Sequence, residues 1–264
     1  MLPRPSACLL LCLPLLAQSP ELRRAESRPV NESVAEDADL LKVIEPARKE
    51  ILAGFGKVIA QAPNGLFRGR AGEENLLGYW IADAMRARAT ALVGSPVKFA
   101  FTNGGGIRGN VKAGDVKVGD IFEVMPFENE MVIVELTGAE VVQVLKESFL
   151  RRAGEPSSGV KASLSGSPDA AVLTVTWSDG SAIAPDEVVK VATSDYLYGG
   201  GDSIPTLKKG RRPYTTGLAL RQVLLDVCEE HGKAGKPLLP PPGGRYAVPP
   251  ELFQSIRDRK LKIP

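Results

Sequence analysis

The spacing of hydrophobic residues along the chain predicts alternating helices and strands. Apolar side chains recur at helical intervals in four stretches, which are Ala47 to Ile59, residues 76–94, Ala139 to about Arg151, and residues 215–232. Short runs rich in β-branched residues predict strands near residues 97–103, 130–138, 170–177 and 187–194. Pro46 suits the first turn of the first helix, and Asn75 suits the N-cap of the second. This alternation favours an α/β domain with a mixed sheet.

The two ends of the chain differ in character from its middle. "MLPRPSACLLLCLPLLAQSP" has Arg4, then an apolar run from Ala7 to Leu16, and small or polar residues near Ala17. This pattern predicts a signal peptide over residues 1–19 and export to the periplasm or the extracellular space. The apolar run is too short for a membrane span, and the alternative is an uncleaved N-terminal anchor. We expect a flexible linker over 20–38, the principal domain over 39–235 and an extended, proline-rich tail over 236–264.

Composition excludes several classes of protein. The 264 residues are 44% hydrophobic and carry 33 basic and 31 acidic side chains, so the basic surface of a nucleic-acid-binding protein is not expected. Without the signal peptide, Cys228 is the single cysteine, and no intrachain disulfide is expected. The single histidine, His231, is predicted at the solvated end of a helix. We therefore expect no metal ligands and no nucleophile–histidine pair in this chain.

Two glycine clusters each follow a predicted strand and carry polar residues at their ends. Asn103 and Arg108 flank the glycines of "TNGGGIRG", whereas Tyr196 and Asp202 flank those of "YLYGGGDS". Glycine allows a ligand to approach the backbone closely, and arginine recognises planar or anionic groups. Neither cluster has the spacing of a P-loop or of a dinucleotide-binding turn. Each cluster by itself fits a tight turn as well as a ligand site, so both interpretations stay open.

Five motifs in a fixed order resemble the C-terminal, substrate-binding domain of the 5′-nucleotidase family. They are "NLLGYWIADAM", "TNGGGIRG", "MPFEN", "VELTGAEVVQVL" and "TSDYLYGGGDS", and the resemblance covers roughly residues 40–225. It implies a four-layer α/β/β/α domain that binds the nucleoside part of a nucleotide. In that family a separate N-terminal metallophosphoesterase domain supplies two metal ions and the hydrolytic water.

The resemblance also implies substrate contacts, residue by residue. Two aromatic rings would sandwich the base, an arginine would contact the phosphate or ribose, two asparagines would contact the base edge, a carboxylate would bind the ribose hydroxyls, and a glycine would offer its backbone. The two rings are Phe127 and Tyr196, and the arginine is Arg108. The two asparagines are Asn103 and Asn129, the carboxylate is that of Asp202, and the glycine is Gly159. Arg68 and Arg70 are both candidates for a further arginine of the family.

Some of these positions depart from the family pattern or have a structural alternative. Tyr196 replaces a more usual phenylalanine, Tyr198 is bulky, and Ser203 stands where glycine is common. Phe127 also fits an ordinary core residue, and Asp202 also fits a turn cap. Arg108 also fits a surface residue that bridges carboxylates.

These observations predict a nucleotide- or nucleoside-binding domain that serves nucleotide hydrolysis together with a separately encoded metallophosphatase. No cofactor is expected in this chain, and divalent metals are expected only in the partner. The alternatives are a stand-alone exported nucleoside-binding protein and a structural remnant that binds neither.

Overall fold

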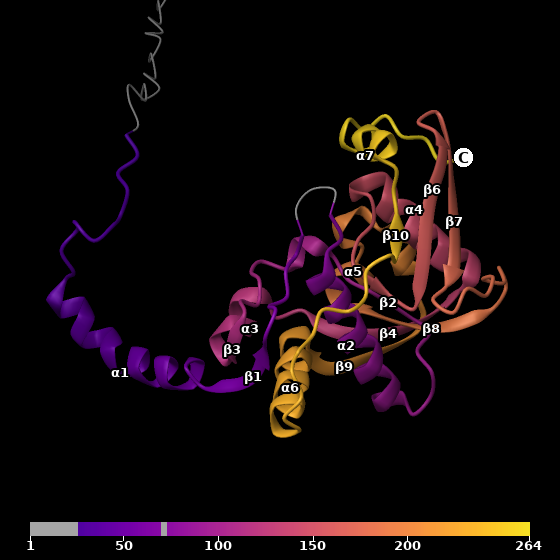
Figure 1. The fold of residues 1–264 in the computed structure, drawn as a ribbon. Helices are drawn as coiled ribbons and strands as arrows, with labels where there is room; N and C mark the ends of the chain where they lie inside the picture. The colour runs from indigo at the N-terminus through magenta and orange to yellow at the C-terminus, as the bar shows by residue number, and fades with distance from the viewer. Residues whose placement is uncertain (1–25, 70–72) are drawn as a thin grey trace, which may run out of the picture. The chain divides into compact units, whose positions relative to one another are not determined.

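The computed structural model describes residues 26–69 and 73–264, and its contacts divide the chain into two units at Pro46. The predicted signal peptide lies outside the described residues. Of the predicted linker, residues 26–37 form no helix or strand. Among the described residues, the larger unit, Ala47–Pro264, contains all the sheets and all the residues of the hydrophobic core (Figure 1).

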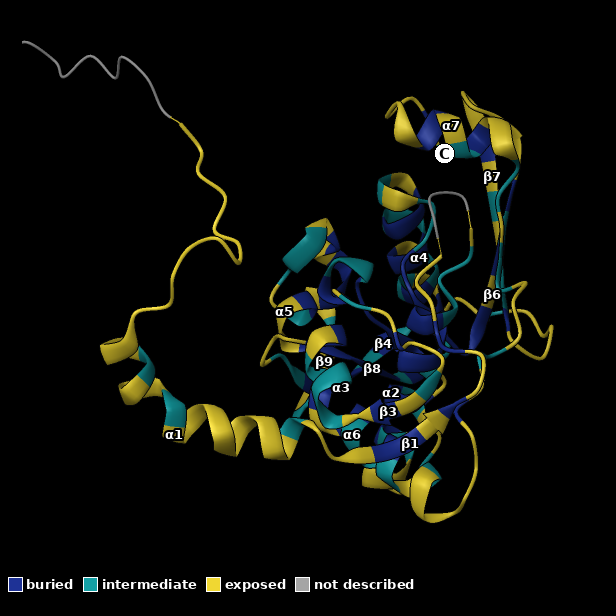
Figure 2. Cartoon of the chain, turned by 60° about the vertical axis from the view of Figure 1, so that its left-hand side comes forward, coloured by how far each residue is buried: buried dark blue, intermediate teal, exposed yellow. Residues whose placement is uncertain are grey.

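Helix α1 begins earlier than the sequence pattern predicted. It spans Ala38–Phe55, so Pro46 lies inside the helix rather than in its first turn. Proline lacks the backbone N–H that a residue inside a helix donates. For this reason the sequence pattern placed Pro46 in the first turn, where that N–H is not needed. Asp39 in the first turn favours the earlier start, because a carboxylate interacts well with the positive end of the helix dipole. No residue of α1 is buried, and the helix is largely exposed in Figure 2.

A five-stranded sheet organises the larger unit. Its strands lie in the order β5-β2-β8-β4-β9. In that order they span Ser157–Ser158, Phe99–Phe101, Val188–Ser194, Glu130–Thr137 and Arg211–Ala219. Strand β8 runs parallel to β2 and antiparallel to β4, so the sheet is mixed, as predicted.

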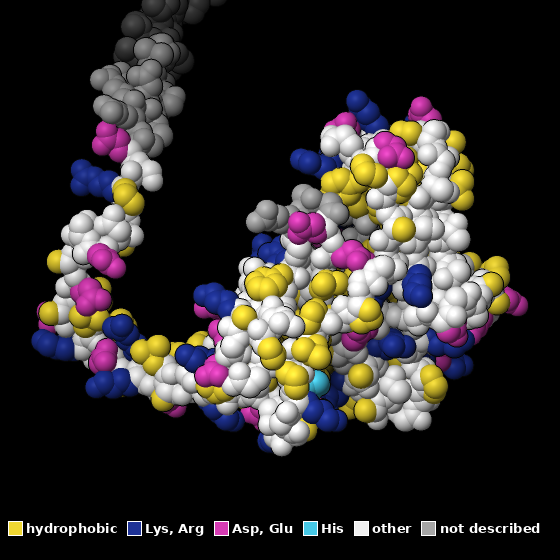
Figure 3. Space-filling model, in the orientation of Figure 1, with side chains coloured by type: hydrophobic (Ala, Val, Ile, Leu, Met, Phe, Trp, Pro, Cys, Tyr) yellow, Lys and Arg dark blue, Asp and Glu magenta, His cyan; other side chains and the backbone are white. Residues whose placement is uncertain are grey.

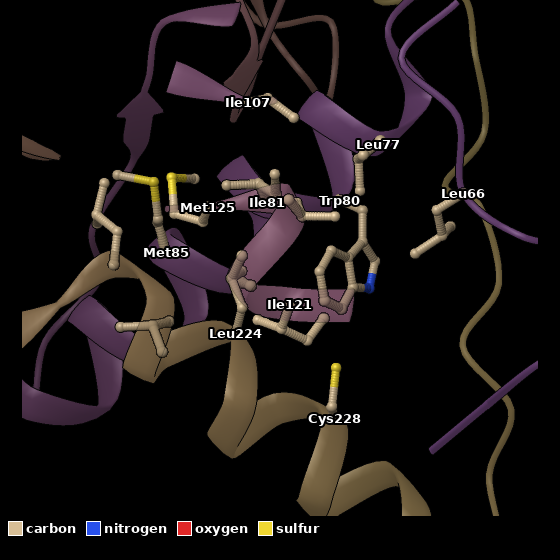
Figure 4. Packing of buried hydrophobic residues seen from close by; sticks show 14 of the residues in the cluster. Leu66, Leu77, Trp80, Ile81, Met85, Ile107, Ile121, Met125, Leu224 and Cys228 are labelled. Carbon is tan, nitrogen blue, oxygen red and sulfur yellow. The ribbon is translucent and has the colours of Figure 1, made fainter. Parts of the chain in front are cut away.

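Helices α2 (Leu76–Val93), α3 (Val118–Val124) and α6 (Leu220–Lys233) cover one face of this sheet. Asn75 is the N-cap of α2, and its Oδ1 accepts from the N–H of Gly78 over 2.8 Å, which confirms the predicted start. Figure 4 shows Trp80, Ile81 and Met85 of α2 meeting Leu224 and Cys228 of α6 in this core. A two-stranded sheet of β1 (Val58–Ala62) and β3 (Gly114–Lys117) completes the layer.

The opposite face packs against helix α4 (Gly138–Arg152) and strands β6 (Val160–Ser167) and β7 (Ala170–Trp177). The side chains of β2 alternate between the two faces of the five-stranded sheet. Phe99 and Phe101 are in the core on this face, whereas Ala100 belongs to the α2 side. The helices and the three sheets of the described residues together form a mixed α/β domain, and the predicted fold class is confirmed.

The C-terminal segment is not the extended tail that its prolines suggested. Strand β10 (Tyr246–Ala247) pairs in parallel with β6, and residues Pro250–Arg257 form helix α7. Pro250 lies in the first turn of α7, where a missing N–H costs nothing. Leu252, Ile256 and Leu261 are buried in a third core with β6 and β7. The segment is therefore part of the packed domain.

Two predicted helix ends are strands in the structure. Residues 215–219 belong to strand β9, and α6 begins only at Leu220; similarly, Val58 and Ile59 begin β1 instead of ending a helix. Both segments pair with strands distant in the sequence, β4 and β3. Strand pairing provides hydrogen-bond partners for the backbone N–H and C=O groups without changing the local spacing of hydrophobic residues. The hydrophobic pattern therefore did not reveal these strands.

Candidate functional site

The two glycine clusters lie against each other in the folded domain. The side-chain amide of Asn103 donates from Nδ2 to Oδ2 of Asp202 over 2.7 Å. A Cβ placed on Gly105 would lie 3.6 Å from the same carboxylate oxygen. Gly104–Gly106 form a short 3-10 turn that starts at Asn103. The clusters are therefore one structure, and not two independent turns.

Asp202 is the centre of this structure. Its Oδ1 accepts from Nη2 of Arg151 over 2.8 Å and from the hydroxyl of Tyr196 over 3.2 Å. Asp202 has a φ of 54°, which is left-handed, a conformation that aspartate tolerates better than most residues. Burial opposes its ionisation, but the hydrogen bonds from Arg151, Asn103 and Tyr196 outweigh burial and lower the pKa of the carboxyl group. Asp202 is thus a charged acceptor near neutral pH.

Arg151 is a member of the site that the sequence did not reveal. It lies in the last turn of α4, where a basic residue is common because it complements the helix dipole. Besides Asp202 it contacts Glu155, with Nη1 3.3 Å from Oε1. Glu155 is 2% exposed and accepts from the backbone N–H of Gly104 over 2.6 Å. Burial raises the pKa of Glu155, and the hydrogen bond from Gly104 counteracts part of that effect. Arg151 and Glu155 together anchor the first glycine turn to α4.

Phe127 and Arg108 form a second group. The guanidinium carbon of Arg108 lies 5.2 Å from the centroid of the Phe127 ring, within cation–π distance. Phe127 is 40% exposed, so it is not an ordinary core residue. The backbone N–H of Arg108 donates to the carbonyl of Val124 over 2.8 Å, which ties the glycine loop to the segment before Phe127.

The segment that carries Phe127 is held in place by the start of helix α6. Arg221 donates from Nη1 to the carbonyl of Met125 over 3.3 Å and from Nη2 to the Glu128 carboxylate. The N–H of Leu220 donates to the carbonyl of Asn129 over 2.8 Å. Arg221 is 8% exposed, and nothing in the amphipathic pattern of α6 distinguishes it. It is the second supporting arginine that sequence reasoning missed.

The sheet topology explains why these segments meet. Strands β2 and β8 are parallel, with Ala100 beside Ala192, so the chain leaves both strands at the same edge. Strand β4 is antiparallel to β8, with Met131 beside Ser194, so β4 begins at that edge. The segments with Asn103, with Phe127 and with Tyr196 therefore emerge together. We call this arrangement the edge cluster; it consists of Asn103, Arg108, Phe127, Asn129, Tyr196 and Asp202.

The two predicted stacking rings are both accessible in the edge cluster. Tyr196 is 45% exposed and lies in the short helix α5 (Asp195–Tyr198), directly after β8. Its ring rests on the second glycine cluster, where a Cβ on Gly201 would be only 2.5 Å from ring atoms. The glycine is required because a side chain there would displace the ring.

The structure does not bring every predicted residue to the edge cluster. Gly159 lies beside Lys98, at the opposite end of β2 from Asn103. A Cβ on Gly159 would lie 1.9 Å from the Lys98 carbonyl oxygen, so close packing explains this glycine. Arg68 lies on the wall of an adjoining cavity, and its backbone N–H donates to Asn110. Arg70 lies outside the described residues.

Neither a metal centre nor a membrane span is found in the described part of the chain. Within residues 26–69 and 73–264, no group of three or more His, Cys, Asp and Glu side chains is arranged to hold a metal ion. His231 lies in the last turn of α6, as predicted, but it is half-buried and its Nδ1 is buried, so the expectation of a solvated side chain was wrong. No helix among the same residues is long and apolar enough to cross a bilayer.

Comparison with known families identifies the domain. Residues 58–209, which include the edge cluster, match the model of the 5′-nucleotidase, C-terminal domain. The chain belongs to this family. The resemblance predicted from the five motifs is thus confirmed.

Relatives of this 5′-nucleotidase C-terminal domain are longer than the chain. The cell wall protein Lmo0130 of Listeria monocytogenes is 28% identical over 252 residues, which cover 87% of this chain and 32% of that protein. The trifunctional nucleotide phosphoesterase protein YfkN of Bacillus subtilis is 30% identical over 176 residues, which cover 62% and 12%. The chain therefore spans about a third or less of these relatives.

The solved 5′-nucleotidase precursor from Thermus thermophilus has the same fold. It superposes with a TM-score of 0.67 over 83% of this chain and 45% of its own, at 24% identity.

Proposed function

We propose that the edge cluster binds the nucleoside part of a nucleotide and that the domain serves nucleotide hydrolysis. The observation that carries this proposal is the Asn103–Asp202 hydrogen bond. It joins two glycine turns at the sheet edge where two accessible aromatic rings also emerge. Family membership and a relative named as a nucleotide phosphoesterase support the choice of ligand.

In this proposal Phe127 and Tyr196 stack on the two faces of the base. Stacking suits a nucleobase because every base offers a flat π-face, and each such contact contributes about 1–3 kcal/mol. Arg108, which already lies over Phe127, faces the ribose or phosphate. Asn129 is placed by its backbone contact to Leu220 and offers its amide to the base edge.

Asp202 would accept a hydrogen bond from the ribose. A carboxylate has about four acceptor positions. Three are used by Arg151 and Tyr196 on Oδ1 and by Asn103 on Oδ2, which leaves room on Oδ2 for one hydroxyl. Because the carboxylate is held on both oxygens, it is preorganised for that contact.

The hydrolytic step is assigned to a separate metallophosphatase. Metal-assisted hydrolysis needs ions at a fixed site with an open position for water. In our proposal the partner polypeptide holds those ions and presents them to the phosphate, while this chain holds the nucleoside. The greater length of the relatives supports a second functional part. Export is also proposed, on the basis of the N-terminal sequence and of the relative named as a cell wall protein.

Calorimetric titration of the purified chain with adenosine and AMP tests the binding step. We expect binding by the natural protein and about tenfold weaker binding by Phe127→Ala and by Tyr196→Ala, since each removes one stacking contact. Tyr214→Ala is the matched control, because Tyr214 is an aromatic residue of similar exposure on strand β9. If neither nucleoside nor nucleotide binds to folded protein, the proposal is wrong.

A second assay tests the division of labour. AMP hydrolysis is measured with Mn²⁺, Zn²⁺ or Co²⁺, with and without a co-expressed metallophosphatase domain from the same source. We expect turnover to require the phosphatase and to fall in the Phe127→Ala variant. Robust turnover by the isolated chain that survives His231→Ala would contradict the assignment. Binding without any effect on a phosphatase would favour the stand-alone binding protein.

A further inference from the structure

A cavity of about 750 Å³ opens beside the edge cluster, between the end of α4, helix α7 and the loop before α2. Its volume is within the range of small-molecule sites, roughly 300–1,000 Å³. Gly104 and Arg151 are on its wall, but neither Phe127 nor Tyr196 lines it. The cavity is therefore adjacent to the proposed nucleoside site and distinct from it.

One wall of this cavity comes from the C-terminal segment, outside the residues that match the family. Tyr246, Phe253 and Arg257 contribute to it. The wall is anchored from behind by Arg245, whose guanidinium makes two hydrogen bonds to Asp83, of 3.0 and 2.5 Å. In addition, the Tyr246 hydroxyl is 2.6 Å from Oγ of Ser157 and donates to the carbonyl of Glu155 over 2.9 Å. These contacts fix the wall before any ligand enters.

The acidic residues on the cavity wall are already engaged. Glu74 accepts from the backbone N–H of Gly244 over 2.7 and 2.8 Å and from that of Arg245 over 3.1 Å. Glu155 accepts from Gly104 and from Arg151. Glu73 also has an interaction partner. Glu74 and Glu155 thus have hydrogen-bond donors other than Arg68, Arg152 and Arg257.

The arginines are less well paired. Four of them line the cavity, and among these four only Arg151 has side-chain hydrogen bonds to carboxylates of the described residues, those of Asp202 and Glu155. Arg152 approaches Glu155 only at 3.7 Å, which is longer than a hydrogen bond. Arg68 and Arg257 take part in no ion pair within the described part of the chain. Guanidinium groups with free donors are well suited to phosphate, which accepts from several of them at once.

The remaining wall is aromatic and apolar. The rings of Tyr79 and Tyr246 meet edge to face, with centroids 5.8 Å apart, and Phe253 and Pro156 extend this surface. A ligand that contacts both the arginine side and the aromatic side of the wall carries a phosphate and a flat apolar body. We propose that this cavity is a binding site for a small organic phosphate, with Arg68, Arg152 and Arg257 around the phosphate and the tyrosines beside its body.

Phenyl phosphate is a suitable probe, because it joins a phosphate to one aromatic ring. Calorimetric titration of the full chain should show binding, with weaker binding of inorganic phosphate and of phenol, which each lack one half. Arg257→Gln and Arg152→Gln should each weaken binding about tenfold, the effect of losing a charge-assisted hydrogen bond. Both side chains are exposed, so we expect unchanged thermal unfolding. Arg212→Gln, an exposed arginine on strand β9, is the matched control.

Two further measurements separate this site from the edge cluster. Phe127→Ala should leave phenyl phosphate binding unchanged, and saturating adenosine should not displace the probe. The inference is overturned if folded natural protein does not bind phenyl phosphate, or if the two arginine variants bind it as well as the control does. Loss of binding in Phe127→Ala would also overturn it, because the probe would then occupy the nucleoside site. Equal affinity for inorganic and phenyl phosphate would refute the role of the aromatic wall.

Discussion

Asn103 and Asp202 are 99 positions apart in the sequence and are joined by a 2.7 Å hydrogen bond. Each residue borders a glycine cluster, so this single contact converts two turns into one rigid unit. The unit is extended by Arg151 and Tyr196, which bond to the other oxygen of the Asp202 carboxylate. The half of the edge cluster formed by Asn103, Tyr196 and Asp202 therefore depends on the charge of Asp202.

Replacing Asp202 by asparagine should change how stability depends on pH. The pKa of Asp202 is lowered in the folded state, so its ionised carboxylate stabilises the folded protein. This stabilisation is present above the pKa of the same carboxyl group in the unfolded chain, roughly 4, and is lost as the pH falls through the folded pKa. Unfolding by urea, measured between neutral pH and about pH 3, should show a smaller loss of stability on acidification in Asp202→Asn than in the natural protein.

The comparison needs a control because other groups titrate nearby. Arg151, Tyr196 and Glu155 surround Asp202, and the raised pKa of Glu155 acts in the opposite direction. Asp169→Asn changes a carboxylate that is 83% exposed in its ion pair with Lys262. This variant should retain the acid sensitivity of the natural protein. Equal pH profiles for Asp202→Asn and the natural protein would contradict the prediction.

Arg151→Met should destabilise the domain by about 2 kcal/mol, since it leaves Asp202 and Glu155 without their shared hydrogen-bond donor. Arg212→Met, at a side chain that is 82% exposed, should cost less than about 0.5 kcal/mol. Arg151→Lys should restore only part of the loss, because one ammonium group cannot reproduce the two separate arms of the guanidinium. Urea unfolding measures all three. A cost equal to that of Arg212→Met would show that Arg151 is not a support of the cluster.

Gly159→Ala should be much more harmful than Gly180→Ala. Both glycines have a left-handed φ, of 95° and 90°, and therefore incur similar backbone strain of about 1–2 kcal/mol. Only Gly159 faces an obstacle, the Lys98 carbonyl oxygen at 1.9 Å, whereas a Cβ on Gly180 meets nothing within 4 Å. The clash should add about 1–3 kcal/mol to the cost. Thermal unfolding of the two variants checks this. Equal losses of thermal stability would show that the neighbouring strand shifts to make room for the added Cβ without an energetic cost.

Cys228 should resist alkylation in the native protein. It is fully buried between α2 and α6, and burial raises the pKa of its thiol to about 12. Because the thiolate is the reactive form, labelling by a maleimide near pH 8 should be very slow in buffer and fast in guanidinium chloride. The Cys228→Ser variant is the control, because any labelling that it retains comes from Cys8 and Cys12. Rapid native labelling lost in Cys228→Ser would mean that α6 opens readily.

The sequence by itself determined the elements whose signals are local. Helix α2 has both the apolar spacing and the Asn75 cap, and strands β4 and β8 are short runs rich in β-branched residues, so each was predicted correctly. The glycine clusters were recognisable because a glycine's freedom is needed wherever another group comes close. The order of five motifs was enough to indicate the family, which the comparison with known families confirmed.

Only the tertiary structure decided which residues meet and which segments pair. Residues 215–219 became part of β9, and residues 250–257 of the proline-rich segment 236–264 became helix α7, because distant partners were available to cover them. In the same way Arg151 and Arg221 look like ordinary helix residues until the carboxylates and carbonyls that they bind are brought next to them. Hydrophobic periodicity records which side of an element is buried. It carries no information about the partner, because hydrogen bonds and strand pairing join atoms that only the folded chain places within reach.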